Sequence, residues 1–388
     1  MTVQRIRIAQ SCSTEPRQAV QEFHAAVQQP DMELVVFFCS SDYDLDVLAA
    51  EMSLLFAGIE VVGCTTAGEI GPGGCRTHSL SGASFPADYF VAVSDLLDNL
   101  SQFDMAKGHD FAQTLLQQLE NRIPQVRPDN SFALLLIDGM SVREEQVSHT
   151  FQYALGKTIL FGGSAGDDQK FSRTYVYRNG SFHSDSAALI LISTSLPFKV
   201  FMTQHFVSTD ERLVVTQADS ATRTVSEING RPAAAEYARL IGVDVRDLGA
   251  RHFSTSPLVV KISGQEYVRS IQKANADGSL TLFCAIDKGV VLRVAHGADL
   301  VKNLQQTFDN IRVEIGKPQL VLGCDCILRN LEISRNGWED RVEEIFRCNN
   351  TIGFNSYGEQ FQGTHVNQTF TGIAIGEEAE STSEPTDG

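Results

Sequence analysis

The chain has 388 residues, of which 43% are hydrophobic and 20% are charged, so its composition is that of a globular protein. Its length exceeds the roughly 250–300 residues at which one core usually stops growing, and we therefore expect two packed domains. The formal net charge of −17 disfavours nucleic acid and anionic membrane surfaces as partners, because both are negatively charged.

The N-terminal sequence MTVQRIRIAQS lacks the apolar centre of a signal peptide, and no stretch approaches the roughly 18 apolar residues that span a bilayer. We therefore expect a cytoplasmic protein without membrane insertion. Most of the eight cysteines lie in apolar runs and are expected to be reduced, buried thiols. Cys324 and Cys326 form a C-x-C pair that either binds a soft metal or places two thiols on one face of a strand.

An internal repeat occurs three times along the chain. Each copy has a buried-strand run, a stretch with apolar residues at helical spacing, a short strand that ends at glycine, and a further strand after a loop. The copies predict three β-α-β-β units that form layered mixed sheets in an α/β fold, with an α+β fold as the alternative. The first copy runs from ELVVFFCSS to IEVVGCTTAGEIG, the second from SFALLLIDGMS to TILFGGSAGDD, and the third from PQLVLGCDCIL to NTIGFNSYGEQ.

Each copy closes on a glycine loop. Glycine permits positive φ and a close approach of the backbone, so these loops form either tight turns or a cradle for a ligand. The ligand reading is favoured by Glu69, Asp167 and Glu359, which follow the second glycine of each loop. The candidate ligand-loop residues are Gly63, Thr65, Gly68, Glu69, Gly162, Gly163, Ser164, Gly166, Gly353, Ser356, Gly358 and Glu359.

An inserted segment separates the second and third copies, from about residue 197 to about residue 317. Its alternating strands and the turn sequence NADGS predict an antiparallel element, and Pro232 suits the first turn of a helix over RPAAAEYARLIG. At the other end, residues 377–388 are acidic and lack apolar periodicity, so we expect a disordered tail.

Catalytic signatures are missing from the sequence. Gly156, Lys157 and Thr158 form a GKT without the upstream glycine of a phosphate-binding loop, and there is no GxSxG or HExxH motif. Asp167 and Asp168 either hold Mg²⁺ or are solvated turn residues. We therefore expect no enzymatic activity; a hydrolase or transferase built on the repeats would need a nucleophile and base that no motif pairs.

Three of the nine histidines are flanked by apolar residues. His205, in FMTQHFVS, is our first candidate for a haem ligand, because a neutral imidazole projecting from a strand into an apolar cavity can bind haem iron. His252 and His365 are the other candidates. A buried histidine that is hydrogen-bonded to a neighbour explains the same sequence. C-x-x-C-H is absent, so haem would be held non-covalently as haem b.

The repeat closures VVGCTTAGEI, LFGGSAGDD and TIGFNSYGEQ, together with VSEINGRPAAAEYARLIG, resemble the FIST family of signal-transduction proteins. The resemblance implies a FIST N-terminal domain over residues 1–225, a FIST C-terminal domain over 226–376, and a role in sensing small ligands. Two further segments are similar to the NosP branch of nitric-oxide-sensing haem proteins. One runs from VRSIQKANADGS to DLVKNLQQTF, and the other is VLGCDCILRNLE.

The NosP resemblance implies a haem b protein that binds nitric oxide and regulates a separate histidine kinase or cyclic-di-GMP enzyme, with an effect on biofilm growth. The alternative is a haem-free FIST module that binds a small metabolite such as an amino acid at the glycine loops. There, Glu69 and Glu359 would meet an ammonium group. Homo-oligomerisation is compatible with either function.

Overall fold

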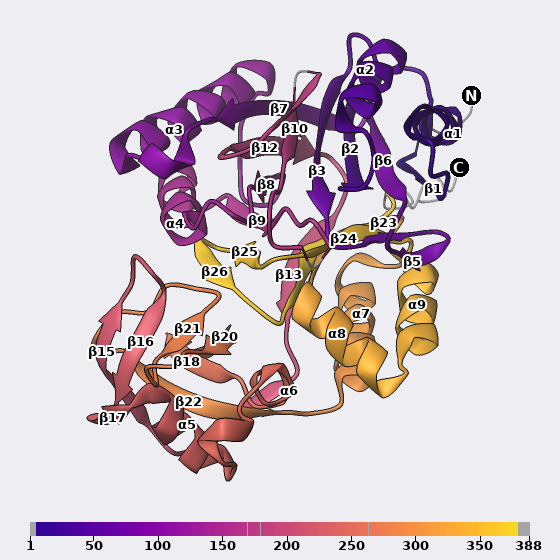
Figure 1. The fold of residues 1–388 in the computed structure, drawn as a ribbon. Coiled ribbons are helices and arrows are strands. Elements are labelled where there is room, and N and C mark those ends of the chain that lie inside the picture. Colours follow the sequence, from indigo (N-terminus) through magenta and orange to yellow (C-terminus); the bar gives the residue numbers. More distant parts are fainter. Residues whose placement is uncertain (1–4, 169, 179, 263, 379–388) are drawn as a thin grey trace, which may run out of the picture.

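The structure is a computed structural model that describes residues 5–168, 170–178, 180–262 and 264–378. It contains three six-stranded mixed sheets and one nine-stranded antiparallel sheet, with helices packed against them (Figure 1). The predicted α/β fold with layered mixed sheets is therefore confirmed. Residues 379–388, most of the predicted disordered tail, lie outside the described residues.

The first repeat places two parallel strands at the centre of its own sheet, in the order β1-β6-β2-β3. Asp44 begins the crossover helix between them, because its carboxylate accepts a hydrogen bond from the Val47 amide at 3.1 Å. The elements are β1 (Arg7–Ser11), α1 (Pro16–Val27), β2 (Met32–Ser40), α2 (Leu45–Leu55), β3 (Glu60–Thr66), the hairpin β4 (Glu69–Gly71) and β5 (Gly74–Arg76), and β6 (Leu80–Pro86).

The second repeat has the same order, β7-β12-β8-β9. Strand β8 is buried along its whole length, as the uninterrupted apolar run FALLLI predicts. The elements are β7 (Phe90–Leu97), the 3₁₀ turn η1 (Leu100–Gln102), α3 (Met105–Arg122), β8 (Ser131–Ile137), α4 (Glu144–Leu155), β9 (Ile159–Ser164), the hairpin β10 (Val176–Arg178) and β11 (Ser181–His183), and β12 (Ala187–Thr194).

The third repeat, β13-β27-β23-β24, is interrupted after its first strand. Gly337, in the left-handed conformation, ends the first of the two helices that connect its parallel strands. The elements are β13 (Phe198–Thr203), α7 (Leu300–Ile315), β23 (Leu320–Cys326), α8 (Ile327–Asn336), α9 (Glu339–Cys348), β24 (Thr351–Ser356), the hairpin β25 (Glu359–Phe361) and β26 (Thr364–Val366), and β27 (Phe370–Ile375).

The three repeats exchange their hairpins in a cycle. Hairpin β4–β5 of the first repeat extends the sheet of the third, β10–β11 of the second extends that of the first, and β25–β26 of the third extends that of the second. One continuous cluster of buried apolar residues runs through all three sheets. The repeats therefore form a single body.

The interruption of the third repeat is a separate sheet with its own apolar core. The chain leaves and rejoins the repeats at adjacent points: the Ala298 amide donates to the His205 carbonyl at 2.7 Å. Its elements are β14 (Phe206–Ser208), β15 (Leu213–Asp219), β16 (Thr224–Ile228), β17 (Arg231–Pro232), α5 (Ala233–Ile241), the 3₁₀ turn η2 (Val245–Asp247), α6 (Ala250–Thr255), β18 (Leu258–Ile262), β19 (Gln265–Arg269), β20 (Ile271–Ala274), β21 (Leu280–Leu282) and β22 (Val291–Gly297).

The structure narrows the predicted insertion of about 197–317 to residues 204–299, because β13 and α7 belong to the third repeat. We call residues 204–299 the inserted domain; it lies at the lower left of Figure 1. Each repeat also begins with a strand and helix that the repeat pattern does not include, β1–α1, β7–α3 and β13–α7. The domain boundary predicted at residue 225 stays a prediction; that residue lies in β16.

Candidate functional site

The three glycine loops meet where the three sheets come together. Two backbone hydrogen bonds join each pair of loops, so every loop is held by both of the others. These bonds run from Ala67 N to Asn355 O (2.9 Å), Asn355 N to Gly68 O (2.7 Å), Gly166 N to Thr65 O (2.9 Å), Asp168 N to Thr66 O (3.1 Å), Ser164 N to Gly358 O (2.8 Å) and Tyr357 N to Ser164 O (3.1 Å).

The side chains of the predicted ligand loops point into this junction. Thr65, Ser164 and Ser356 have no exposed surface, and neither have the carboxyl groups of Glu69 and Glu359. The glycines allow the loops to touch: a Cβ on Gly166 would lie 2.7 Å from the Ala67 nitrogen. The geometry corresponds to the tight-turn interpretation of the glycines. The equivalent hydroxyl residues are Thr66, Ser164 and Ser356, so Gly162 lies two residues before its hydroxyl, whereas Gly63 and Gly353 lie three before theirs.

Glu69 and Glu359 occupy equivalent buried positions. The Glu69 carboxyl group bonds to the Thr66 hydroxyl, to the Ser79 amide at 3.0 Å and to the Ser79 hydroxyl at 2.8 Å. The Glu359 carboxyl group bonds in the same way to the Ser356 hydroxyl and to the amide and hydroxyl of Thr369. Burial raises the pKa of both carboxyl groups to about 8, despite these hydrogen bonds. Both are therefore mainly protonated at pH 7 and hold the loops as neutral hydrogen-bonding groups.

Asp167, the third loop acid, organises a surface segment instead. Its carboxylate accepts from the amides of Phe171 (2.9 Å), Ser172 (2.8 Å) and Arg173 (2.8 Å), and from the Tyr357 hydroxyl. Burial acts to raise its pKa, but these donors together hold the pKa below its ordinary value. Asp167 therefore fixes the segment that carries Phe171.

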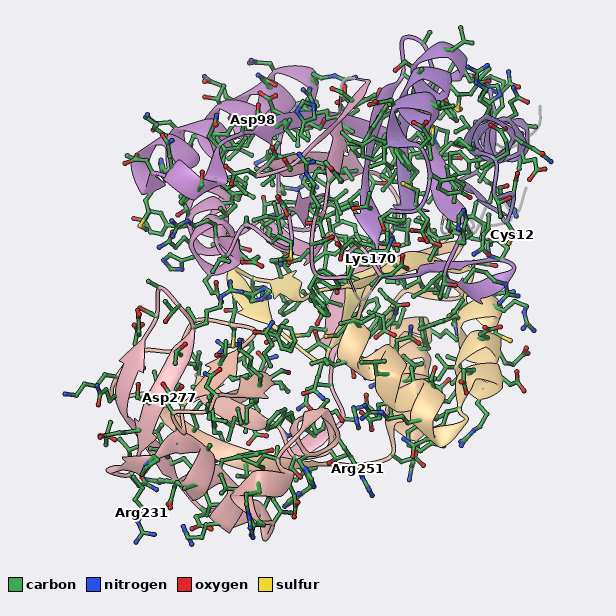
Figure 2. The ribbon with its side chains drawn as sticks, in the orientation of Figure 1. Cys12, Asp98, Lys170, Arg231, Arg251 and Asp277 are labelled. Atoms are coloured by element: carbon green, nitrogen blue, oxygen red, sulfur yellow. The ribbon has the colours of Figure 1, made fainter. Side chains whose placement is uncertain are left out.

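The same segment is tied to the first repeat. Lys170 bonds to Asp42 in the loop after β2, and its Nζ lies 3.7 Å from the Asp168 carboxylate. Figure 2 shows Lys170 near the middle of the molecule, whereas Arg231 and Asp277 lie on the inserted domain.

A cleft of about 350 Å³ lies beside the loop junction, between the repeats and the inserted domain. The second repeat contributes Gly139–Val142 and Phe171, the third repeat contributes Tyr357, and the inserted domain contributes the β15–β16 turn and β20–β21. The lining residues are Gly139, Met140, Val142, Glu144, Phe171, Ala221, Thr222, Arg223, Gln272, Thr281, Leu282, Phe283 and Tyr357. We call this the junction cleft.

The lip of the junction cleft is apolar and strained. Met140, Val142 and Phe171 are large apolar side chains that remain exposed, at 39%, 45% and 39%. Val142 and Phe171 also adopt positive φ angles, of 57° and 48°. For a β-branched and an aromatic residue these conformations cost on the order of 1–3 kcal/mol each, and such strain concentrates at functional sites.

The floor of the cleft is a buried ion cluster that joins the two bodies. Arg223 of the inserted domain bonds to Glu144 and Glu145 at the start of α4, and its Nη1 donates to the Phe283 carbonyl at 2.8 Å. Burial raises the pKa of Glu144 to about 7. Burial opposes ionisation of Glu145 as well, but His365, Arg223 and the Ala285 amide together keep its pKa below the usual value. The Nε–H of Arg223 is buried and has no hydrogen-bond partner among the described residues, which costs about 1–3 kcal/mol.

The three alternative candidates for the haem ligand lie in different surroundings. His205 is fully buried, but its Nε2 pairs with Glu332 on α8 at 3.0 Å instead of facing an apolar cavity. His365 is buried against Gly358, and burial lowers its pKa to about 4. His252 lies on α6 in the inserted domain. None of the three is among the described residues that line the junction cleft. Each of the three has one buried ring nitrogen without a hydrogen-bond partner among the described residues, and the haem assignment stays a prediction.

The structure also bears on the predicted C-x-C metal site and on membrane insertion. Cys324 and Cys326 lie buried in β23, where burial raises the pKa of both thiols well above the ordinary value. The described residues contain no group of three or more histidine, cysteine or acidic side chains arranged to hold a metal ion. They also contain no helix that is long and apolar enough to cross a membrane.

Comparison with known proteins identifies the class of this chain. The FIST N domain matches residues 33–231 and the FIST C domain matches residues 233–362. The chain therefore belongs to the FIST family, whose domains are sensory signal-transduction modules. The boundary between the two matches falls within the inserted domain. The NosP branch stays a prediction.

Two further comparisons add little. No curated protein matches the chain. A solved structure described as a cyanuric acid hydrolase, an evolutionary innovation by structural concatenation, aligns over 96% of this chain and 99% of its own. The sequence identity is 8% and the TM-score is 0.36, so no functional argument rests on it.

Sequence reasoning did not single out Phe171, Arg223 and Phe283 of the junction cleft. The one available signal was the pair Glu144 and Glu145 at the start of a helix, a position where acids commonly only stabilise the helix dipole. Their partner Arg223 lies 79 positions from Glu144 and in another body, so spacing cannot reveal the pair.

We predict that Gly166→Ala lowers the free energy of unfolding by about 1–3 kcal/mol, because the new Cβ would overlap the backbone of Ala67 and Thr66. Urea unfolding followed by circular dichroism measures this loss. Gly249→Ala is the control, since its Cβ meets nothing within 4 Å. Equal stabilities of the two variants would contradict the close contact of the loops.

The buried acids predict a specific pH dependence. The folded chain keeps protons on Glu69 and Glu359 up to about pH 8, whereas the unfolded chain releases them above about pH 4.5, so both groups destabilise the fold as the pH rises between these values. Glu69→Gln with Glu359→Gln should remove this loss. Relative to the wild type, its stability should rise by up to about 1.4 kcal/mol per pH unit for each carboxyl.

Denaturant unfolding at several pH values between 5 and 8 tests this prediction. Glu120→Gln, at an exposed position on α3, is the control and should follow the wild type at each pH. A double variant whose stability stays parallel to that of the wild type would show that the two carboxyls are already ionised in the fold.

Proposed function

We propose that this FIST protein is a sensor that binds a small ligand in the junction cleft, and that a separate protein detects whether the cleft is occupied. The observation that carries this proposal is the combination of exposed apolar side chains, strained backbone and a buried ion cluster in one cavity. A volume of about 350 Å³ is at the small end of ligand pockets, so the ligand is small.

The position of the cleft supports a role in signalling. The chain enters and leaves the inserted domain at two adjacent points, after β13 and before α7, and hydrogen bonds such as Ser270 Oγ to Gln368 Oε1 at 2.8 Å also hold the domain to the third repeat. A ligand that changes these contacts would reorient the domain about the two connections. Arg223 ties its β15–β16 turn to α4 across the cleft floor. A ligand that binds one orientation more tightly would shift the population towards that orientation.

The proposed output is a partner in trans, and the resemblance to the NosP branch suggests a histidine kinase or a cyclic-di-GMP enzyme. A binding role is favoured over catalysis because the loop acids Glu69 and Glu359 are engaged by hydroxyl groups inside the protein. For the same reason, a metabolite such as an amino acid would bind in the junction cleft instead of at these acids. A cytoplasmic location stays a prediction.

A haem-based nitric oxide sensor is the second candidate, and it rests on the sequence resemblance. Haem would require an imidazole that faces a cavity large enough for the macrocycle. His205 instead bonds to Glu332, and His365 packs against Gly358. We therefore favour the haem-free module.

We predict that a thermal-shift screen of small metabolites finds compounds that raise the melting temperature of the full chain. Phe171→Ala should weaken their binding at least tenfold, because it removes part of the exposed apolar lip. Tyr153→Ala is the matched control, since Tyr153 is 76% exposed on α4 and does not line the cleft. Hits that bind both variants equally would place the ligand elsewhere.

We also predict that the chain, expressed with haem precursor and then incubated with haemin, shows no stoichiometric Soret band that shifts with nitric oxide. Absorption spectra of the ferric, ferrous and nitric-oxide-treated protein test this. A stoichiometric band that His205→Ala abolishes would instead establish His205 as the haem ligand and replace the proposed function.

A further inference from the structure

The ion cluster in the floor of the junction cleft contains two acids and one base. Arg223 Nη2 donates to a carboxyl oxygen of Glu144 and, at 2.8 Å, to one of Glu145. The other oxygen of Glu145 accepts from the Ala285 amide at 2.6 Å, and Arg223 Nη1 donates to the Phe283 carbonyl at 2.8 Å. The β15–β16 turn and the segment after β21 are therefore both attached to the start of α4 through this cluster.

The surroundings of the cluster supply little further charge. Within the described residues, Arg223 is the one cation at ion-pair distance from Glu144. The other titratable or charged groups nearby are Cys284, His365 on β26 and Arg269 on β19. Burial raises the pKa of the Cys284 thiol to about 12 and lowers that of His365 to about 4, so both are neutral at pH 7. Arg269 donates to the His365 carbonyl at 2.9 Å instead of pairing with an acid.

One proton on the acid pair balances the charge of the cluster. Two ionised carboxylates on one guanidinium would leave a net negative charge in a buried site, whereas one shared proton leaves an ion pair and a neutral carboxyl. Glu144 is only 2% exposed, and this burial, together with the neighbouring Glu145, raises its pKa to about 7 against the opposing effect of Arg223. Glu144 therefore carries the proton and releases it near neutral pH.

We propose that Glu144, Glu145 and Arg223 form a proton-dependent latch between the inserted domain and the repeats. With one proton on the acid pair, the β15–β16 turn stays attached to α4. Loss of this proton weakens the attachment and loosens the floor of the junction cleft, which the turn lines with Ala221, Thr222 and Arg223. The regulatory meaning of the latch rests on the proposed function, because a looser floor changes the site at which the ligand binds.

The direction of the pH effect follows from proton binding. When the turn is released, Glu144 is exposed to water and its pKa returns towards the ordinary value of 4.5. Between these two pKa values the attached state holds a proton that the released state has lost. Release therefore becomes easier as the pH rises, by at most about tenfold per pH unit, and the effect levels off above pH 7.

Hydrogen–deuterium exchange of the full chain without ligand tests the latch, because exchange detects local release even when the released state is rare. Protection factors, which remove the intrinsic pH dependence of exchange, should fall on the order of tenfold between about pH 5.5 and 7.5 in residues 221–225 and 281–285. The reference segment is α2, a surface helix of the first repeat, which should show the same pH profile in the wild type and in the variants.

Two variants restore the charge balance without a proton. Glu144→Gln replaces the protonated carboxyl with a neutral amide, and Glu145→Gln leaves a single carboxylate for Arg223. Each should remove the fall in protection, so the test does not depend on one variant folding. Glu120→Gln, at an exposed position on α3, is the matched control and should behave as the wild type. Circular dichroism confirms that the variants are folded. Constant protection in the wild type, or an equal fall in the folded Gln variants of the cluster, would overturn the latch.

This experiment separates the latch from the proposed function, because it contains no ligand. If the pH dependence appears but the thermal-shift screen finds no compound that binds the cleft, the latch stands and the sensing function fails. If compounds bind in a manner that depends on Phe171 while Glu144→Gln and the wild type share one pH profile, the cleft is a ligand site and the latch is wrong.

Discussion

The backbone hydrogen bonds between the three glycine loops are the constraint on which the rest of the structure depends. They hold the three repeats together where the sheets meet, and each repeat also gives its hairpin to a neighbour's sheet. The glycines are required because the loop backbones are in direct contact, and the protonated acids Glu69 and Glu359 fill the remaining polar positions without placing charges in the core. The second loop differs: its acid, Asp167, stays ionised and holds a surface segment in place.

That difference produces the candidate site. The segment held by Asp167 carries Phe171 into the space between the repeats and the inserted domain, and Tyr357 from the third loop supports it by stacking. The inserted domain completes the cleft with Arg223 and Phe283, so the cavity exists only where the two bodies meet. Membership of the FIST family gives this cavity a context, because a ligand between two connected bodies can change their arrangement without any catalytic step.

The sequence predicts the repeated units and the inserted domain because long apolar runs and glycine loops recur at similar spacing. It does not reveal the exchanged hairpins, since β4, β10 and β25 have three residues each and pair with strands from other repeats. The glycine loops are correctly identified as a shared feature, but their side chains form a packed junction. The cleft residues could not be predicted, because Phe171, Arg223 and Phe283 lie outside regular elements and meet only through the tertiary fold. His205 illustrates the opposite case: its apolar sequence environment suggests a cavity, but its ring bonds to a half-buried carboxylate, Glu332.

Hydrogen–deuterium exchange of the full chain, with and without the first compound that raises its melting temperature, tests the central claim most directly. If the ligand occupies the junction cleft, protection should appear in residues 139–145 and 170–175 of the repeats and in residues 221–225 and 281–285 of the inserted domain. Protection confined to other parts of the chain, such as the groove between α7 and α9, with these four segments unchanged, would contradict the assignment of the sensory site.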